Sequence, residues 1–245
     1  MINLIKLHFS YLYSWKIIYI SLIILLISLI SFTFLSNFYY DNNLLVFYSD
    51  YYTEEYTFSS LSLIKIIVLL QSMFIVINGF VINKYDVYLL IRSNRLSVIL
   101  SKIITMLIGV IIFTVSIYLL MNIIGLFLTP YYKFSSEHLN IMYDLIIFSI
   151  LYTLLYIFLI ITIKNMYSLL IIFILYFISN ISSEYLVMKS DLSIFTKLIN
   201  LVFPDIGYFS NIGYDLYYSN LYYIAICIGL IQAILVIYKK MDILN

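Results

Sequence analysis

The sequence predicts an all-α, polytopic membrane protein with six transmembrane helices. Two observations predict this fold class. The first is composition, since 64% of the 245 residues are hydrophobic and only 10% are charged, whereas a soluble domain carries roughly 25% charged residues. The second is the presence of six apolar stretches, each long enough to cross a hydrocarbon layer about 30 Å thick.

Each apolar stretch is expected to form a helix, because lipid holds no water that could satisfy the backbone groups. The six predicted spans are residues 17–35, 61–83, 98–128, 141–163, 166–188 and 220–238. The third is longer than a bilayer requires, which predicts a helix that is tilted or that extends beyond the membrane. Only Lys164 and Asn165 separate the fourth and fifth, which predicts a tight helical hairpin. We therefore expect residues 1–245 to form a single transmembrane domain.

The distribution of charge predicts the orientation. The N-terminus, the second gap, the fourth gap, the C-terminus and the adjoining helix ends hold nine basic residues but only two acidic ones, Asp86 and Asp242. The remaining gaps and their helix ends hold the other ten acidic residues against four lysines. By the positive-inside rule, the first set and both termini are cytoplasmic. The nine basic residues are Lys6, Lys16, Lys84, Arg92, Arg95, Lys102, Lys164, Lys239 and Lys240.

Two predicted cytoplasmic elements stand out beside the apolar spans. Residues 1–16 have apolar side chains at helical spacing, which indicates an amphipathic helix in the inner interface or, equally, a simple basic anchor. Residues 84–97 begin polar, continue through an apolar run that contains Tyr88, and turn at residues 92–95. That pattern is typical of a short helix that docks on an acidic cytoplasmic partner, although a plain basic loop fits it as well.

The sequence lacks several signals of catalysis. None of its six glycines begins a phosphate-binding loop that ends in Gly-Lys-Ser/Thr, so ATP hydrolysis by that route is excluded for this chain alone. His8 and His138 lie on opposite predicted sides of the membrane, and neither has the spacing of a zinc site. The single cysteine, Cys227, can form no intrachain disulfide. We therefore predict no catalytic residue, no metal site and no cofactor in this chain, and no nucleic-acid partner.

Polar residues inside the predicted spans are candidates for a substrate pathway. Gln71, Asn122 and Gln232 lie at depth, where interhelical hydrogen bonding is the alternative role. The ionisable residues Lys65 and Asp144 lie near outer helix ends, as does Glu184, rather than at the bilayer centre where ion-coupled carriers usually place such groups. An ion-coupled carrier is therefore the second choice.

These features resemble the membrane subunit of type-2 ABC transporters, the exporter permeases of six helices. Residues 1–16 resemble the connecting helix of that family, the run from Arg95 to Lys102 its entry to the third helix, and residues 189–219 its outer reentrant region. The ending from Tyr238 to Ile243 is also similar. The resemblance implies an ATPase-coupling helix in residues 84–97. Its implied transmitting residues are Tyr85, Asp86, Tyr88, Leu89, Ile91, Arg92 and Arg95.

The resemblance also implies the partners and the activity. A separate ABC ATPase subunit would bind ATP and Mg, and two permease copies, identical or different, would pair in membrane lipid. The expected location is the plasma membrane of a bacterium, and the expected cargo is an amphipathic peptide or a lipid-like or drug molecule. An ion-coupled secondary transporter and a non-transporting membrane immunity protein remain the alternative functions.

Overall fold

The computed structural model describes residues 2–13, 15–43, 49–81, 94–128, 132–134, 136–163, 170–174, 176 and 216–240. The named helices are α1 (Ile2–Leu12), α2 (Trp15–Asn43), α3 (Ser49–Val81), α5 (Arg95–Leu128), α6 (Ser136–Ile163) and α10 (Leu216–Lys240). All of these except α1 contain a segment long and apolar enough to cross a membrane, five in all. The prediction of an all-α protein with several helices of membrane-spanning length is therefore confirmed for the described residues. The predicted span 166–188 and the reentrant region 189–219 lie mostly outside them.

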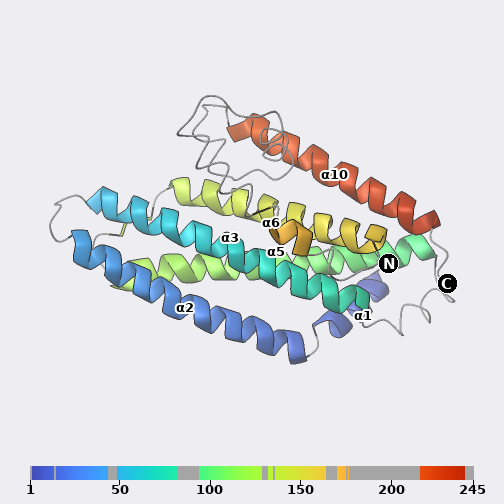
Figure 1. The fold of residues 1–245 in the computed structure, drawn as a ribbon, viewed down its shortest axis with the longest axis horizontal. Helices are drawn as coiled ribbons and strands as arrows, with labels where there is room; N and C mark the ends of the chain where they lie inside the picture. The colour runs from blue at the N-terminus through green and yellow to red at the C-terminus, as the bar shows by residue number, and fades with distance from the viewer. Residues whose placement is uncertain are drawn as a thin grey trace.

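The helices form a central group and a peripheral group. Helices α3, α5 and α6 pack against one another, α2 packs on α3 and α5, and α10 packs mainly on α6 (Figure 1). In the apolar windows of α3, α5 and α6, 56%, 50% and 61% of residues are buried inside the protein, against 17% in both α2 and α10. The two peripheral helices therefore present most of their surface to the surroundings.

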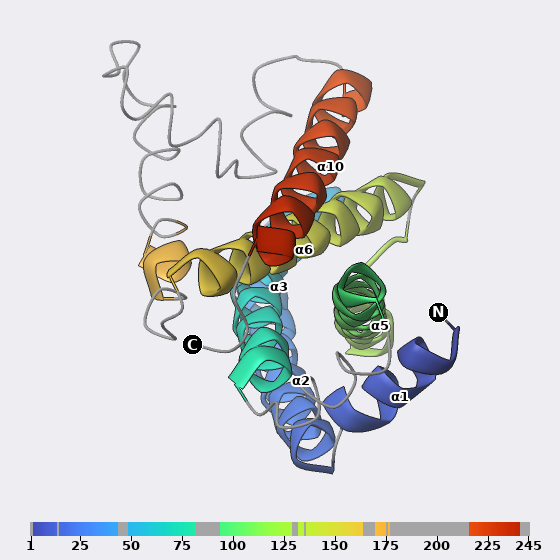
Figure 2. The same cartoon turned by 90° about the vertical axis from the view of Figure 1, so that its right-hand side faces the viewer.

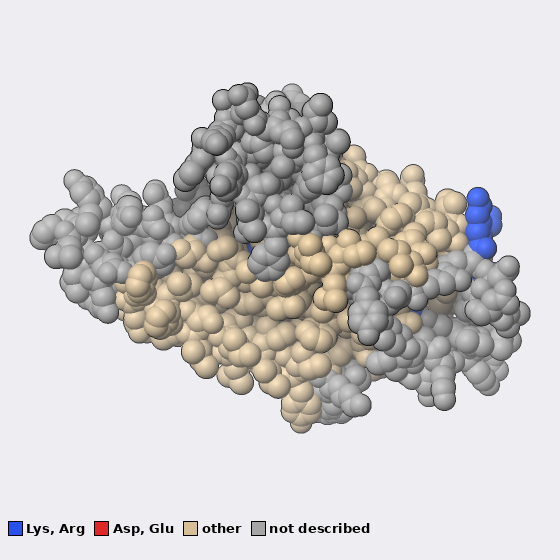
Figure 3. All heavy atoms as spheres, viewed as in Figure 1, with Lys and Arg blue, Asp and Glu red and all other residues tan. Residues whose placement is uncertain are grey.

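Helix direction agrees with successive membrane crossings. Helices α2, α3, α5 and α6 alternate in direction, whereas α10 runs the same way as α6 (Figure 1). The C-terminal end of α10, with the exposed Lys239 and Lys240, consequently lies at the same end of the bundle as α1 and the start of α5. Cationic side chains are seen at that end in Figure 3, while uncharged side chains cover most of the described flank. The predicted common side of the N-terminus, second gap and C-terminus is consistent with this arrangement.

Two helices are much longer than a bilayer is thick. Helices α3 and α5 have 33 and 34 residues, which corresponds to about 50 Å at 1.5 Å per residue. At the start of α5, Asn94 caps the helix, since its side-chain Oδ1 accepts the Leu96 N–H at 3.2 Å and its carbonyl accepts the Ser97 N–H at 2.9 Å. Helix α5 thus begins three residues before the predicted span 98–128 and includes Arg95.

Serines form the face of α2 that meets the bundle. Ser28, Phe32 and Ser36 are fully buried, whereas the intervening Ile30 and Phe34 are 68% and 69% exposed. Small side chains allow the backbones of two helices to approach closely, which supplies packing energy where lipid removes the hydrophobic driving force. Many of the large aliphatic residues of α2, such as Leu22, Ile23 and Leu26, are exposed on the side that lipid can cover.

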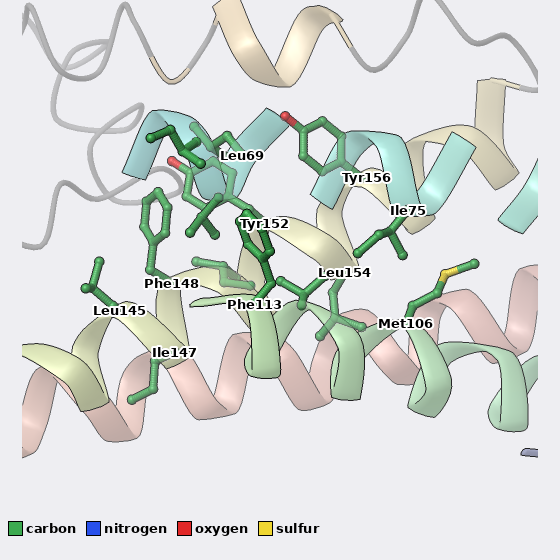
Figure 4. Packing of buried hydrophobic residues seen from close by; sticks show 14 of the residues in the cluster. Leu69, Ile75, Met106, Phe113, Leu145, Ile147, Phe148, Tyr152, Leu154 and Tyr156 are labelled. Carbon is green, nitrogen blue, oxygen red and sulfur yellow. The ribbon is translucent and has the colours of Figure 1, made fainter. Parts of the chain in front are cut away.

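Aromatic residues fill the centre of the bundle. Tyr152 and Tyr156 of α6 are completely buried, and Phe148 packs on Tyr152 with ring centroids 4.5 Å apart. Figure 4 shows these rings among aliphatic side chains of α3 and α5, with Phe113 and Met106 on the α5 side. Buried aromatic rings therefore occupy much of the contact region between α3, α5 and α6.

Candidate functional site

The predicted ATPase-coupling residues lie almost entirely outside the described part of the chain. Tyr85, Asp86, Tyr88, Leu89, Ile91 and Arg92 belong to residues 82–93, of which nothing is described. Arg95 is described, and it is the exposed first residue of α5, directly after the Asn94 cap. The structure therefore defines the two helix ends that carry the segment, the end of α3 at Val81 and the start of α5.

Helix α1 is linked to α5 by Tyr13, whose ring lies against Gly109 of that helix. The N–H of Tyr13 donates to the carbonyl of Phe9 at 3.1 Å, which turns the chain after α1. The Tyr13 side chain reaches α5, where its hydroxyl lies 3.4 Å from the Thr105 carbonyl. A Cβ added to Gly109 would overlap the hydroxyl end of Tyr13, so only glycine leaves room for this ring. Gly109 and Tyr13 are named the inner seat here, after the predicted orientation.

Burial also defines the chemical state of the inner seat. Desolvation raises the pKa of Tyr13 above its ordinary value. The hydroxyl is consequently neutral throughout the physiological pH range and can donate to the Thr105 carbonyl. Tyr13 precedes the apolar window of α2, which begins at Ile17, and tyrosine is favoured at membrane boundaries.

Helix α3 contacts the same end of α1. Asn78 donates from Nδ2 to the Leu12 carbonyl at 3.1 Å, and this carbonyl is one that α1 itself leaves without a helical partner. A Cβ on Gly79 would overlap the Met106 methyl group and come within 3.1 Å of a Leu12 methyl group. Leu12 is 3% exposed. The end of α1 is therefore enclosed between α3 and α5 (Figure 2).

A buried lysine lies beside this junction. Lys102 of α5 is 3% exposed, and its ammonium nitrogen lies 4.5 Å from the centre of the Phe80 ring of α3. A cation over an aromatic face is stabilised by the ring quadrupole, and more strongly when water is excluded. This contact is a second link between α3 and α5 at the end where residues 82–93 connect them.

The three predicted pathway residues do not come together. Gln71 of α3 donates from Nε2 to the Ser21 hydroxyl of α2 at 2.6 Å. Asn122 of α5 lies near the other end, because the neighbouring Met121 carbonyl accepts the Tyr56 hydroxyl of α3 at 3.0 Å. Tyr56 and Gln71 are fifteen positions, or about 22 Å, apart along α3. Gln232 is exposed on α10.

Gln71 makes an interhelical contact, the alternative to substrate binding, whereas Asn122 donates from Nδ2 to the Tyr118 carbonyl of its own helix at 2.8 Å. Asn122 Oδ1 accepts the hydroxyl of Tyr132 at 2.6 Å, which ties the segment after α5 back to that helix. Gln71 uses its Nε2 on α2, while its Oε1 is buried with no hydrogen-bond partner among the described residues. Gln71 therefore retains one acceptor for a further polar group. Oδ1 of Asn122, in contrast, already accepts the Tyr132 hydroxyl.

A second glycine of α5 seats a second tyrosine. A Cβ on Gly125 would lie 2.9 Å from Cγ of Tyr132 and within 3.1 Å of two further ring atoms. The Tyr132 ring also meets Tyr56 and His138 edge to face, each with centroids 5.6 Å apart. Gly125 and Tyr132 are named the outer seat. It is the counterpart, at the predicted outer end, of the inner seat at Gly109.

Sequence reasoning identified neither seat. The signal that could have identified them is the position of Gly109 and Gly125 inside an otherwise bulky apolar span, because glycine in such a helix marks a close approach. Which residue approaches cannot be inferred from the glycine alone, since Tyr13 lies 96 positions away from Gly109 in the sequence.

The main feature among the described residues is a set of packed helix ends, not a cluster of side chains suited to catalysis or metal binding. Among them, no group of three or more His, Cys, Asp or Glu side chains could hold a metal ion. The features that converge are the end of α1, the end of α3 and the first half of α5, which begins next to the predicted coupling segment. No protein-family model, curated protein or solved structure matches this chain.

Proposed function

We propose that this chain is the membrane-spanning subunit of an ATP-driven exporter of the type-2 ABC kind. A separate ATPase subunit with ATP and Mg binds residues 84–97, and the permease moves an amphipathic peptide or a lipid-like or drug molecule out of the cytoplasm or the membrane. Two permease copies pair around the pathway in a bacterial plasma membrane. The chain itself performs no catalysis.

The projecting start of α5 is the observation that carries this proposal. The inner seat marks the membrane boundary, and α5 continues from Thr105 to Arg95, a further ten residues or about 15 Å. Residues 82–93 are attached to this projecting end and to the end of α3. A partner in the cytoplasm can therefore reach them, and a force on them acts directly on two central helices.

The position of charged groups favours this function over an ion-coupled carrier. Among the residues whose side chains the structure describes, Lys65 and Lys102 are the buried lysines, and Asp144 is the only carboxylate. Asp144 is partly buried about two turns from the start of α6. A carrier driven by protons or sodium usually has ionisable groups nearer the bilayer centre.

Gentle purification of the tagged chain from its native membrane tests the proposal. We expect an ABC ATPase to accompany the wild-type chain in stoichiometric amount and to be lost when Tyr88 and Leu89 are both changed to Asp. The matched control is the double change Phe134→Asp and Leu139→Asp, which alters an aromatic residue and a leucine that are 49% and 54% exposed at the opposite end. This control should retain the ATPase.

Two results would contradict the proposal. Retained ATP-driven export in the Tyr88→Asp, Leu89→Asp variant would exclude residues 84–97 as the coupling segment. A pure chain without ATPase would favour an alternative function. Transport that stops when the ion gradient is dissipated would then identify a secondary transporter, and protection without flux would identify an immunity protein.

A further inference from the structure

We propose that the inner seat is a latch, in which the Tyr13 ring held on Gly109 makes α1 follow the movement of α5 at the inner membrane surface. The latch rests on the proposed function only for the source of the movement, which is the ATPase acting on residues 84–97. The seat itself is a property of the chain alone.

The contacts give α1 two attachments to α5 and one to α3. His8 and Leu12 of α1 are 5% and 3% exposed, and α1 packs mainly on α5. Tyr13 then extends this packing to Thr105 and Gly109, one turn apart on α5. Because Gly109 has no side chain, the ring contacts the α5 backbone directly and a shift of that backbone is transmitted without slack.

Helix α1 also contacts α3, so it is attached to both helices that flank residues 82–93. The Asn78 side chain holds the Leu12 carbonyl, and Gly79 receives the Met106 side chain of α5 beside Leu12. The end of α1 therefore touches both helices that carry residues 82–93. Any change in the spacing of these two helix ends must either move α1 or break one of its contacts.

The latch can be released at little cost. Its one polar contact is long, at 3.4 Å between the Tyr13 hydroxyl and the Thr105 carbonyl, near the limit for a useful hydrogen bond. The part of Tyr13 in contact with Gly109 is the far end of a side chain that rotates about two bonds. Once released at the membrane boundary, the hydroxyl can bond to water or a lipid headgroup.

Distance measurement on the full chain in lipid nanodiscs tests the seat without any partner. Spin labels are attached to Asn3→Cys on α1 and Ile112→Cys on α5, both at exposed positions, in a background with the single cysteine changed by Cys227→Ser. We expect one narrow distance distribution in the labelled parent. Gly109→Ala should broaden or shift it, because the added methyl group displaces Tyr13.

Gly229→Ala is the matched control, since a Cβ there meets no atom within 4 Å. It should leave the distribution unchanged. Tyr13→Ala is the second test variant and adds no atom to α5, so it reports on the latch even if Gly109→Ala does not fold. An unchanged distribution in a folded Gly109→Ala or Tyr13→Ala variant would overturn the latch.

Movement is then measured in the complex with its ATPase. A label at Leu139→Cys on α6 is the reference for the Asn3→Cys label on α1. We expect ATP binding to change this distance in the parent and in Gly229→Ala, and to leave it unchanged in Gly109→Ala, although the ATPase remains bound. A full nucleotide response in Gly109→Ala would contradict the latch and leave the permease assignment intact. Absence of any ATPase would contradict the proposed function, while the nanodisc distances would still decide the seat.

Discussion

The two seats on α5 hold tyrosines in different ways. They are sixteen positions apart, or about 24 Å along the helix, which is most of the thickness of a hydrocarbon layer of about 30 Å. At the outer seat, Gly125 meets Cγ of Tyr132, the root of the ring. At the inner seat, Gly109 meets the hydroxyl end of Tyr13. Rotation about the Cα–Cβ bond moves the ring root through a shorter arc than the hydroxyl end, so a ring end can rotate further away.

The surrounding contacts strengthen this difference. Tyr132 donates to Asn122 at 2.6 Å, and Tyr118 donates to the His138 carbonyl at 2.8 Å, so the outer end of the α5 and α6 pair is closed by short hydrogen bonds. The inner seat has a single polar contact of 3.4 Å for its tyrosine. The comparison indicates that the outer end is a fixed support and that movement is concentrated at the inner end.

Deleting the ring of the outer seat should have the largest effect on stability. Tyr132→Ala removes a side chain that is 4% exposed and packed on Gly125, Tyr56 and His138, and a cavity of that kind costs about 3–5 kcal/mol. Thermal unfolding of the detergent-solubilised chain measures the loss. Phe134→Ala, two positions away and 49% exposed, is the control. Equal losses in the two variants would show that the outer end is not a support.

Replacing Gly109 or Gly125 with alanine compares the two seats by the stability that each variant loses. Gly125→Ala should cost about 1–3 kcal/mol, the usual range for overpacking, because the ring root that it meets moves less on side-chain rotation than a ring end does. Gly109→Ala should cost less because Tyr13 can leave, and Gly229→Ala should be neutral or stabilising by up to about 1 kcal/mol because alanine favours a helix. Unfolding of the three variants under identical conditions measures the order. A larger loss for Gly109→Ala than for Gly125→Ala would reverse the comparison.

Breaking the hydrogen bond between Gln71 and Ser21, between the two ends of the bundle, should cause an intermediate loss of stability. Ser21→Ala leaves the Gln71 amide without its 2.6 Å contact and should cost about 0.6–1.7 kcal/mol, the range for hydrogen bonds between membrane helices. Gln71→Leu removes the unbonded Oε1 as well, so it should cost less than Ser21→Ala. Transport assays on the same variants separate two roles of Gln71. Loss of transport without loss of stability in Gln71→Leu would identify a pathway residue.

The smallest effects should come from removing a single hydroxyl. Tyr132→Phe leaves Asn122 Oδ1 without its 2.6 Å donor and should cost about 1 kcal/mol. Tyr13→Phe deletes only a 3.4 Å contact, so its cost should be below about 0.5 kcal/mol. Because Tyr13→Phe keeps the ring on Gly109, it should also preserve the narrow distance distribution between α1 and α5. A greater loss of stability in Tyr13→Phe than in Tyr132→Phe would contradict the difference between the seats.

Part of the candidate site could be predicted from the sequence. The expectation of a helix over residues 1–16, separate from the first span, agrees with α1 and with the turn at Tyr13. An interhelical contact was one of two predicted roles for Gln71 and Asn122, and the structure shows such a contact for Gln71 alone. The sequence could not separate Gln232, which is exposed, from Gln71, which is buried.

The sequence by itself predicted the all-α fold class and, for the described residues, five helices of membrane-spanning length at their approximate positions. This was possible because lipid leaves the backbone few solutions other than a helix, and because length and apolarity are properties of one segment. Only the tertiary structure decided which faces pack. Apolar residues occupy every side of α2 and α5, so no periodic pattern distinguishes the lipid-facing side from the buried one. The pairing of Gly109 with Tyr13, and of Gly125 with Tyr132, depends on shape complementarity between separate segments, which appears only once the helices are assembled.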